Sequence, residues 1–194
     1  MIHNYSARYK NIILRPLLKK DIEMLRNWRN DAEATKYLRN IGKITPEMQS
    51  RWFESYLLNS DEYSFSIVYI GDFHAIVGSV SLYNFLNTQA EVGKIQIGDV
   101  RAHGKGIGRT ALVMILELGF KVFGLKKIVA GVNQCNVASH SNFMKIGFRI
   151  TGTHKSISSF GGVEDEIEID LSTLEKVNSY ATNIEIGIGY KNKV

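Results

Sequence analysis

The stretch from residue 95 to residue 110 constrains the fold more than any other part of the chain, because an apolar strand pattern ends there, a glycine-rich turn follows and a long helix pattern begins. The turn has glycine at alternate positions: Gly104, Gly106 and Gly108. Glycine lets backbone approach a ligand closely, and the first turn of a helix offers unpaired N–H donors at the positive end of its dipole. Arg101, Lys105 and Arg109 add positive charge around the same point. The segment therefore predicts a pyrophosphate-binding turn between a strand and a helix.

Two common nucleotide-binding architectures do not account for this turn. No Gly-Lys-Ser/Thr follows the glycines at the spacing of a kinase-type phosphate loop. A dinucleotide fingerprint normally follows the first strand of a parallel unit, whereas strand patterns over residues 64–70, 75–83 and 90–97 precede this turn. The connections between these strands are short, which predicts antiparallel neighbours. The turn therefore lies at the end of an antiparallel meander.

Helices and strands on either side of this meander complete the predicted fold. Before it come a short strand over residues 11–15 and two helices, one capped by Asp21 and one by Thr45 with Pro46 at its first position. After it come a helix over 106–123, a strand over 127–132, a helix over 137–145, and strands over 148–151 and 164–170. We therefore expect a single α/β domain of the α+β mixed-sheet kind, with a mostly antiparallel central sheet and helices on both faces.

The domain is expected to span residues 1–172, and residues 173–194 form a C-terminal tail whose pattern is ambiguous. Ile184, Ile186 and Ile188 alternate with other residues, as they would in a strand. The tail therefore either adds an edge strand or packs on a partner chain, which would make a homodimer contact.

Two motifs resemble the acetyl-CoA signatures of the GNAT N-acetyltransferases. His103-Gly104-Lys105-Gly106-Ile107-Gly108 is similar to Gln/Arg-x-x-Gly-x-Gly/Ala, and Asn136-x-x-Ser139-x-x-x-Phe143-x-Lys145-Ile146-Gly147-Phe148 is similar to Asn-x-x-Ala/Ser-x-x-x-Tyr-x-Lys-x-Gly-Phe. Upstream, Leu14-Arg15-Pro16-Leu17 and Trp28-Arg29-Asn30-Asp31 resemble the opening of ribosomal-protein alanine acetyltransferases. A second branch, which acetylates amino sugars on nucleotides, has a similar pattern to Trp28-Arg29-Asn30, Ile44-Thr45 and Trp52. The resemblance covers roughly residues 10 to 172 and leaves the two branches open.

The resemblance implies an enzyme that transfers an acetyl group from acetyl-CoA to a primary amine by direct attack in a ternary complex. The acceptor would be a protein N-terminus, an amino-sugar nucleotide or another small amine, and the alternative is a non-catalytic CoA-binding regulatory module of the same fold. The backbone of Gln96 and Ile97 would pair with the pantetheine arm, and Asn136 and Phe143 would flank its thioester end. The residues implied to hold the pyrophosphate are His103, Gly104, Lys105, Gly106, Ile107, Gly108, Arg109 and Thr110.

The chemistry needs a base, because an acceptor ammonium must lose a proton before it can attack. Glu91 is the candidate base, and the alternative reading is a solvent-facing strand carboxylate. The usual proton donor is missing, because Phe143 stands where the family has tyrosine. Tyr83, Ser139, His140 or water could take that role.

The two leading helices are expected to form one wall of the acceptor cleft, as they do in the family. Arg26, Arg29 or Arg39 would then meet an acidic or phosphorylated acceptor. His103 also departs from the family pattern, since the usual Gln or Arg would supply an amide donor or a permanent charge.

Composition bears on the cellular location and on the partners that the protein can have. The single cysteine, Cys135, excludes an internal disulfide and is expected to be a small buried thiol in a cytoplasmic protein. The longest apolar stretch, residues 111–120, is far shorter than the ~20 residues of a membrane span. The net charge of +5 attracts polyanions, but the charges form no stripe interleaved with exposed aromatic residues. We therefore expect acetyl-CoA and an amine as partners, and no metal, membrane or nucleic acid.

Overall fold

The computed structural model describes residues 3–38, 42–158, 160–179 and 181–190. These residues form one mixed sheet with the strand order β7-β8-β6-β5-β4-β3-β2-β1-β9. The strands are β1 Tyr5–Tyr9, β2 Ile12–Pro16, β3 Glu62–Ile70, β4 His74–Leu86, β5 Gln89–Ile97, β6 Lys127–Asn133, β7 Arg149–Lys155, β8 Val163–Ile169 and β9 Glu185–Ile188. The helices are α1 Ile22–Arg29, α2 Ala32–Thr35, α3 Pro46–Leu58, α4 Ile107–Lys121, α5 Val137–Ile146 and α6 Leu171–Val177. Among the described strands, only β5 and β6 pair in parallel, so the predicted mixed, mostly antiparallel sheet is confirmed.

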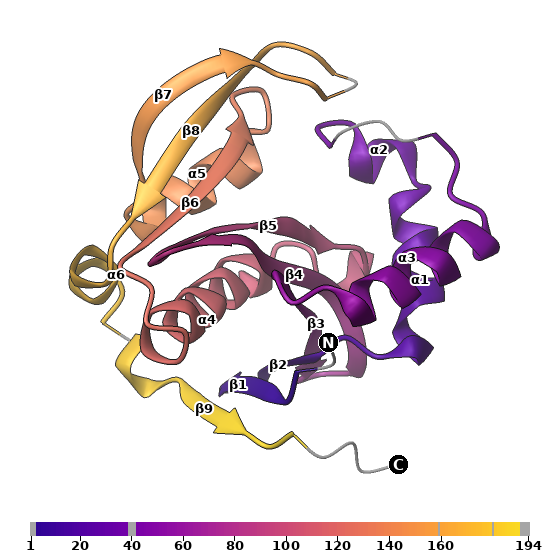
Figure 1. Cartoon of the computed structure of the whole chain (residues 1–194), viewed down its shortest axis with the longest axis horizontal. Coiled ribbons are helices and arrows are strands. Elements are labelled where there is room, and N and C mark those ends of the chain that lie inside the picture. The colour runs from indigo at the N-terminus through magenta and orange to yellow at the C-terminus, as the bar shows by residue number, and fades with distance from the viewer. Residues whose placement is uncertain (1–2, 39–41, 159, 180, 191–194) are drawn as a thin grey trace.

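The outer edge of the sheet has one strand that the sequence patterns did not predict, β1, and one that was an alternative for the C-terminal tail, β9. β1 pairs antiparallel with β2, and β9 pairs antiparallel with β1, with Ala7 opposite Ile186. Figure 1 shows β9 running along this edge, on the far side of the sheet from β7 and β8. The C-terminal tail thus includes an edge strand.

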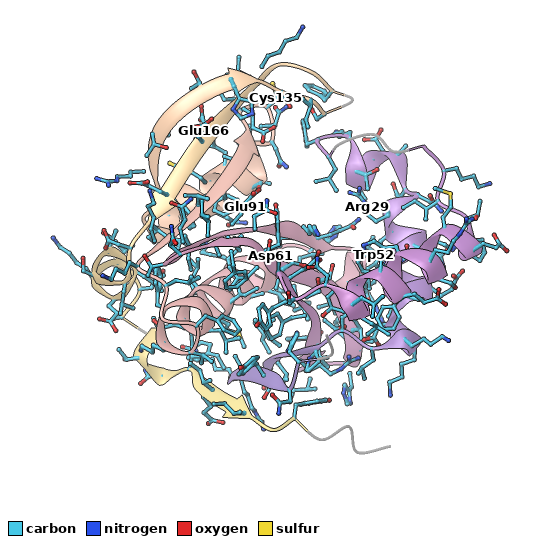
Figure 2. The ribbon with its side chains drawn as sticks, in the orientation of Figure 1. Arg29, Trp52, Asp61, Glu91, Cys135 and Glu166 are labelled. Atoms are coloured by element: carbon cyan, nitrogen blue, oxygen red, sulfur yellow. The ribbon has the colours of Figure 1, made fainter. Side chains whose placement is uncertain are left out.

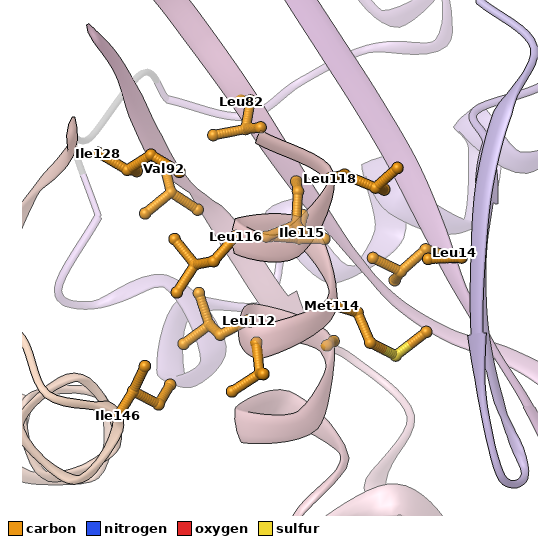
Figure 3. Close-up of a cluster of buried hydrophobic side chains, with 14 of the residues drawn as sticks. Leu14, Leu82, Val92, Leu112, Met114, Ile115, Leu116, Leu118, Ile128 and Ile146 are labelled. Carbon is orange, nitrogen blue, oxygen red and sulfur yellow. The ribbon is translucent and has the colours of Figure 1, made fainter. Parts of the chain in front are cut away.

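Helix α4 packs against one face of the sheet and contributes more residues to the buried core than any other helix (Figure 3). Leu112, Met114, Ile115, Leu116 and Leu118 are all at most 2% exposed. A helix that is apolar on every side is stable only when it is buried on every side. Close approach to the sheet depends on Gly119, because an added Cβ there would lie 2.7 Å from Ile128 Cδ1.

The opposite face of the sheet carries α1 and α3, which have a small apolar cluster of their own: Leu17, Ile22, Phe53 and Tyr56. Strand alternation explains the division, because Phe65 and Ile67 point towards the α4 core while Ser64 and Ser66 point towards the helical pair. The predicted helices on both faces are therefore confirmed.

The two predicted helix caps have different outcomes. Thr45 is confirmed as the cap of α3, since its hydroxyl accepts a hydrogen bond from Met48 N–H at 3.3 Å. The prediction for Asp21 is wrong, because its side chain makes no cap hydrogen bond to α1. Its buried carboxylate instead forms an ion pair with Arg15 at 2.6 Å and accepts a hydrogen bond from Ser66 Oγ at 2.8 Å. Leaving the buried Arg15 guanidinium without a carboxylate would cost more free energy than leaving the start of α1 without a side-chain cap.

Candidate functional site

The site is built where β5 leaves its neighbour β6. The two strands pair at only three positions, from Gln89 opposite Lys127 to Glu91 opposite Val129. On its other side, β5 carries one extra residue relative to β4 between the pairs Ser81–Gly93 and Ser79–Gln96. Lys94 lies in this bulge with φ +49°. A bulge bends its strand, and Figure 1 shows β5 and β6 diverging from a common start.

The divergence leaves one edge of β5 without a strand partner among the described residues beyond Glu91. Such an edge presents backbone N–H and C=O groups that can pair with an extended ligand. Gln96 lies on this edge, and its side chain is engaged elsewhere, donating to Trp28 O at 3.0 Å. The open edge suits the expected backbone pairing of this part of β5 with a pantetheine arm, but the carbonyl of Ile97 already lies 2.9 Å from His103 Nε2.

The glycine turn has the conformation that its sequence predicts. Gly104 and Gly106 both have φ +73°, and an added Cβ would meet no heavy atom within 4 Å at either position. Backbone conformation, and not crowding, is therefore what requires glycine here. The Thr110 N–H donates to Gly106 O at 3.1 Å, which begins the hydrogen bonds of α4. The N–H groups of the first turn before Thr110 are left for a ligand, as a pyrophosphate cradle requires.

Side-chain charge contributes less to the turn than the sequence suggests. Arg101 forms an ion pair with Asp99 at 2.6 Å, and Lys105 forms one with Asp72 at 3.0 Å. Arg109 Nε donates to Asn142 Oδ1 at 3.3 Å. The backbone amides of this turn therefore have fewer protein partners than its basic side chains do.

The ring of His103 lies 2.9 Å from Ile97 O through Nε2, so it fastens the loop to the end of β5. The residue that departs from the family pattern at this position thus has a structural contact of its own.

A cavity of about 530 Å³ lies between the sheet and the helices α1 and α3. This volume suits a small-molecule ligand. Of the residues predicted to act at the site, the cavity is lined by Tyr83, Glu91, Gln96, Asn136, Ser139 and Phe143. The pyrophosphate residues from His103 to Thr110 and Ile97 lie outside its lining. The structure thus places the predicted site residues in two groups, those that line the cavity and those that form the glycine turn.

Glu91 is held in position by two donors. Tyr83 Oη donates to Glu91 Oε1 at 2.6 Å, and Asn84 Nδ2 donates to Glu91 Oε2 at 3.0 Å. Burial raises the pKa of Tyr83, and the hydrogen bond to Glu91 raises this pKa further. Tyr83 therefore stays protonated and is committed to Glu91, which makes it an orienting group more than a proton donor.

Ser139 and Phe143 lie one turn apart on α5 and both line the cavity. Asn136 caps this helix, accepting from Ser139 N–H at 3.2 Å. Phe143 is 2% exposed and packs edge to face on Phe148 with 4.9 Å between ring centroids. Within the described residues, Ser139 Oγ makes no hydrogen bond, so its hydroxyl can serve a ligand.

The other candidates near α5, His140 and Cys135, do not line the cavity. His140 Nε2 lies 2.9 Å from Oδ2 of the buried Asp165, and His140 does not line the cavity. The prediction that Cys135 is buried is wrong, because this residue is exposed on the turn between β6 and α5 (Figure 2). Its N–H is bonded to Asn133 Oδ1 at 2.9 Å, which fixes the turn with the thiol outward.

The helical wall of the cavity includes two residues that the sequence singled out, Arg29 and Trp52. Arg26 instead forms an ion pair with Glu23 and donates to Ile44 O at 3.1 Å. Arg39 lies outside the described residues. Sequence reasoning missed the lining residues Tyr37, Gln49, Lys94 and Glu164. They belong to no motif and meet only through the topology.

None of the helices among the described residues is both long and apolar enough to cross a membrane. The His, Cys, Asp and Glu side chains of these described residues form no group of three that could hold a metal ion.

Comparison with known proteins adds to this geometry. Residues 11–149 match the sequence model of a family described as Acetyltransferase (GNAT) domain. The Bacillus subtilis protein named "Probable N-acetyltransferase YjcK" is 27% identical over 168 residues, which cover 82% of this chain and 92% of that protein. Spermidine N-acetyltransferase from Vibrio cholerae, solved with CoA and spermine, has a TM-score of 0.75 and 20% identity over 84% of this chain and 98% of that chain. Ribosomal-protein-S5-alanine acetyltransferase from Vibrio fischeri has a TM-score of 0.71 and 22% identity over 85% of this chain and 96% of that chain.

Proposed function

Because the chain belongs to the GNAT acetyltransferase family and is an N-acetyltransferase, we propose that it acetylates a primary amine with Glu91 as the base. The acceptor is a protein N-terminus or a small amine such as an amino-sugar nucleotide, and it attacks directly in a ternary complex. One observation carries the proposal. The Glu91 carboxylate, fixed by Tyr83 and Asn84, opens into the same cavity as Gln96 and Phe143.

Acetyl-CoA is the proposed cosubstrate, and it supplies the acetyl group as an activated thioester. The unpaired edge of β5 suits its extended arm, and the amides that follow Gly104 and Gly106 suit its pyrophosphate. The presence of CoA in the similar Vibrio cholerae enzyme supports this assignment.

The role of Glu91 follows from the charge of the acceptor. A protein N-terminal amine, with a pKa near ~7.7–8.0, is mostly an ammonium at neutral pH, and in that form it has no free lone pair. Glu91 takes up its proton, directly or through one water, and the hydrogen bonds from Tyr83 and Asn84 keep the carboxylate aimed at the cavity.

Ser139 is the proposed proton donor to the leaving sulfur. Phe143 has no hydroxyl, whereas Ser139 lies one turn earlier on the same face of α5 with its Oγ unengaged among the described residues. A thiol with a pKa near ~8.5 can leave as the thiolate without a proton donor, although more slowly than with one. The contribution of Ser139 to kcat is therefore expected to be small.

Cytoplasmic location and pairing of two copies through the tail are also proposed. The single, exposed Cys135 is compatible with a reducing compartment. The outer edge of β9 is a strand edge at which a second copy could pair.

The first test is thermal unfolding of the protein with acetyl-CoA, with ATP, with NAD and without ligand. A ligand at a hundred times its Kd adds ~2.7 kcal/mol, which raises Tm by about 5–10 °C in a domain of this size. Acetyl-CoA alone should produce this shift. No shift with saturating acetyl-CoA would contradict the assignment of the glycine turn.

The second test is release of CoA in the presence of a panel of amines. Glu91→Gln should lower kcat by about 10²–10⁴-fold, and Glu166→Gln on β8, outside the cavity lining, is the matched control. Binding of acetyl-CoA without CoA release would instead favour the non-catalytic module. Equal activity of Glu91→Gln and the wild type would remove Glu91 from the mechanism.

A further inference from the structure

The two walls of the cavity differ in charge. Among the described lining residues between 17 and 52, Arg29 is the one with a formal charge. The facing sheet wall carries two carboxylates, Glu91 and Glu164, and one cation, Lys94. Lys94 is already paired with Glu62 at 2.6 Å. The cavity is therefore bipolar, with the Arg29 guanidinium on the wall opposite the carboxylate that receives the amine.

Arg29 has no partner in the part of the chain that the structure describes. It ends α1 and is half-buried, and burial lowers the pKa of its guanidinium. Arg26, one turn earlier on the same helix, is engaged by Glu23. A partly buried charge without a counter-ion is unfavourable. A bound anion would therefore supply the counter-ion that Arg29 needs.

The position of Arg29 is fixed by contacts of its neighbour. Gln96 Nε2 donates to Trp28 O at 3.0 Å, and an added Cβ at Gly98 would lie 2.0 Å from the Trp28 ring. These contacts hold the end of α1 against the end of β5, so Arg29 is presented to the cavity from a rigid element. Figure 2 shows Arg29 and Glu91 on opposite sides of the opening between the helices and the sheet.

We propose that Arg29 binds an anionic group of the acceptor, so that the substrate is an amine that also carries a phosphate or a carboxylate. The proposal rests on the proposed function and adds the substrate class. A guanidinium binds either anion through two parallel hydrogen bonds. A polyamine such as spermine fits poorly, because the described residues of the helical wall include the cation Arg29 and no carboxylate.

The test compares matched amines that differ only in the anion. Glucosamine 6-phosphate is compared with glucosamine, and glycylglycine with glycylglycine amide, with spermidine as a fifth acceptor. CoA release gives kcat/KM for the wild type, Arg29→Gln and Arg29→Lys. Arg51→Gln, on the exposed side of α3 and outside the cavity lining, is the control.

The wild type should prefer one anionic member over its neutral partner by on the order of 10–100-fold, as expected for a charge-assisted bidentate contact. The preferred pair distinguishes phosphate from carboxylate. Arg29→Gln should lose this preference, Arg29→Lys should keep part of it and Arg51→Gln should keep all of it. A wild type that acetylates the neutral amines or spermidine as well as the anionic ones overturns the proposal, and so does an Arg29→Gln variant that keeps the preference.

The outcome is separable from failure of the proposed function. If acetyl-CoA raises Tm but no amine is turned over, the same pairs are titrated calorimetrically into protein saturated with CoA. Tighter binding of an anionic member that is lost in Arg29→Gln supports the proposal, and equal or absent binding of both members overturns it. If acetyl-CoA does not bind, the proposed function itself fails.

Discussion

Replacing Gly106 by alanine isolates the contribution of the glycine turn to ligand binding. Gly106 has φ +73°, and an alanine Cβ would meet no heavy atom within 4 Å. The cost is therefore backbone strain, ~1–2 kcal/mol for an L residue in the left-handed region. The smaller entropy of the unfolded alanine chain returns ~0.4–1 kcal/mol. The net loss of about 1 kcal/mol should lower Tm by ~2–4 °C.

Gly124 provides a matched control at the other end of α4. It has φ +65°, and an added Cβ would again meet nothing within 4 Å. Gly124→Ala should therefore lose about as much stability as Gly106→Ala, through the same strain. Only Gly106→Ala should lose acetyl-CoA binding, because relaxing its backbone turns the amides of the glycine turn.

The assay is thermal unfolding of the wild type and both variants with and without acetyl-CoA. At a hundred times Kd, the wild type should gain ~2.7 kcal/mol, or about 5–10 °C. Gly124→Ala should show the same gain, and Gly106→Ala should show little of it at the same concentration. A full gain in Gly106→Ala, or an equal loss in both variants, would refute the assignment of these amides.

Two further predictions concern the proton donor and pH. Ser139→Ala should lower kcat by less than Glu91→Gln does, because a thiolate can leave without a donor; a loss as large as that of Glu91→Gln in CoA-release assays would count against this ranking. His3 has its pKa lowered to about 4 by burial, against 6.5 in the unfolded chain, so the unfolded state binds more protons between these values. Protonation of His3 therefore does not reduce the free energy of unfolding above pH ~6.5, and it lowers that free energy by about 3 kcal/mol as pH drops towards ~4. In His3→Phe, denaturant titrations should show this part of the pH dependence gone, and an unchanged slope would contradict it.

Local sequence signals predicted those parts of the fold that depend on neighbours in the chain. The Thr45-Pro46 start of α3 and the glycine-rich turn between β5 and α4 are set by the residues themselves, and the structure has both. Asp21 was misassigned because its carboxylate pairs with the buried Arg15 six positions earlier and accepts from Ser66 45 positions later. The burial of Arg15, and the position of Ser66 beside Asp21, become visible only in the folded sheet.

The parts of the site that sequence could not predict arise from strand pairing. The bulge at Lys94 depends on the register between β4 and β5, and a lysine gives no sign of a positive φ. The second motif pointed to Asn136 and Phe143, but the place of Arg29 on the cavity wall appears only once α1 is placed against β5.

The helical wall of the cavity also has a consequence for how such enzymes can diversify. β2 and β3 are neighbours in the sheet, with Pro16 opposite Phe65, so residues 17–61 form one continuous excursion between paired strands. That excursion has its own apolar cluster and contributes Arg29 and Trp52 to the cavity. We therefore expect that exchanging this excursion between homologous chains alters acceptor choice and leaves β5 and the glycine turn unchanged.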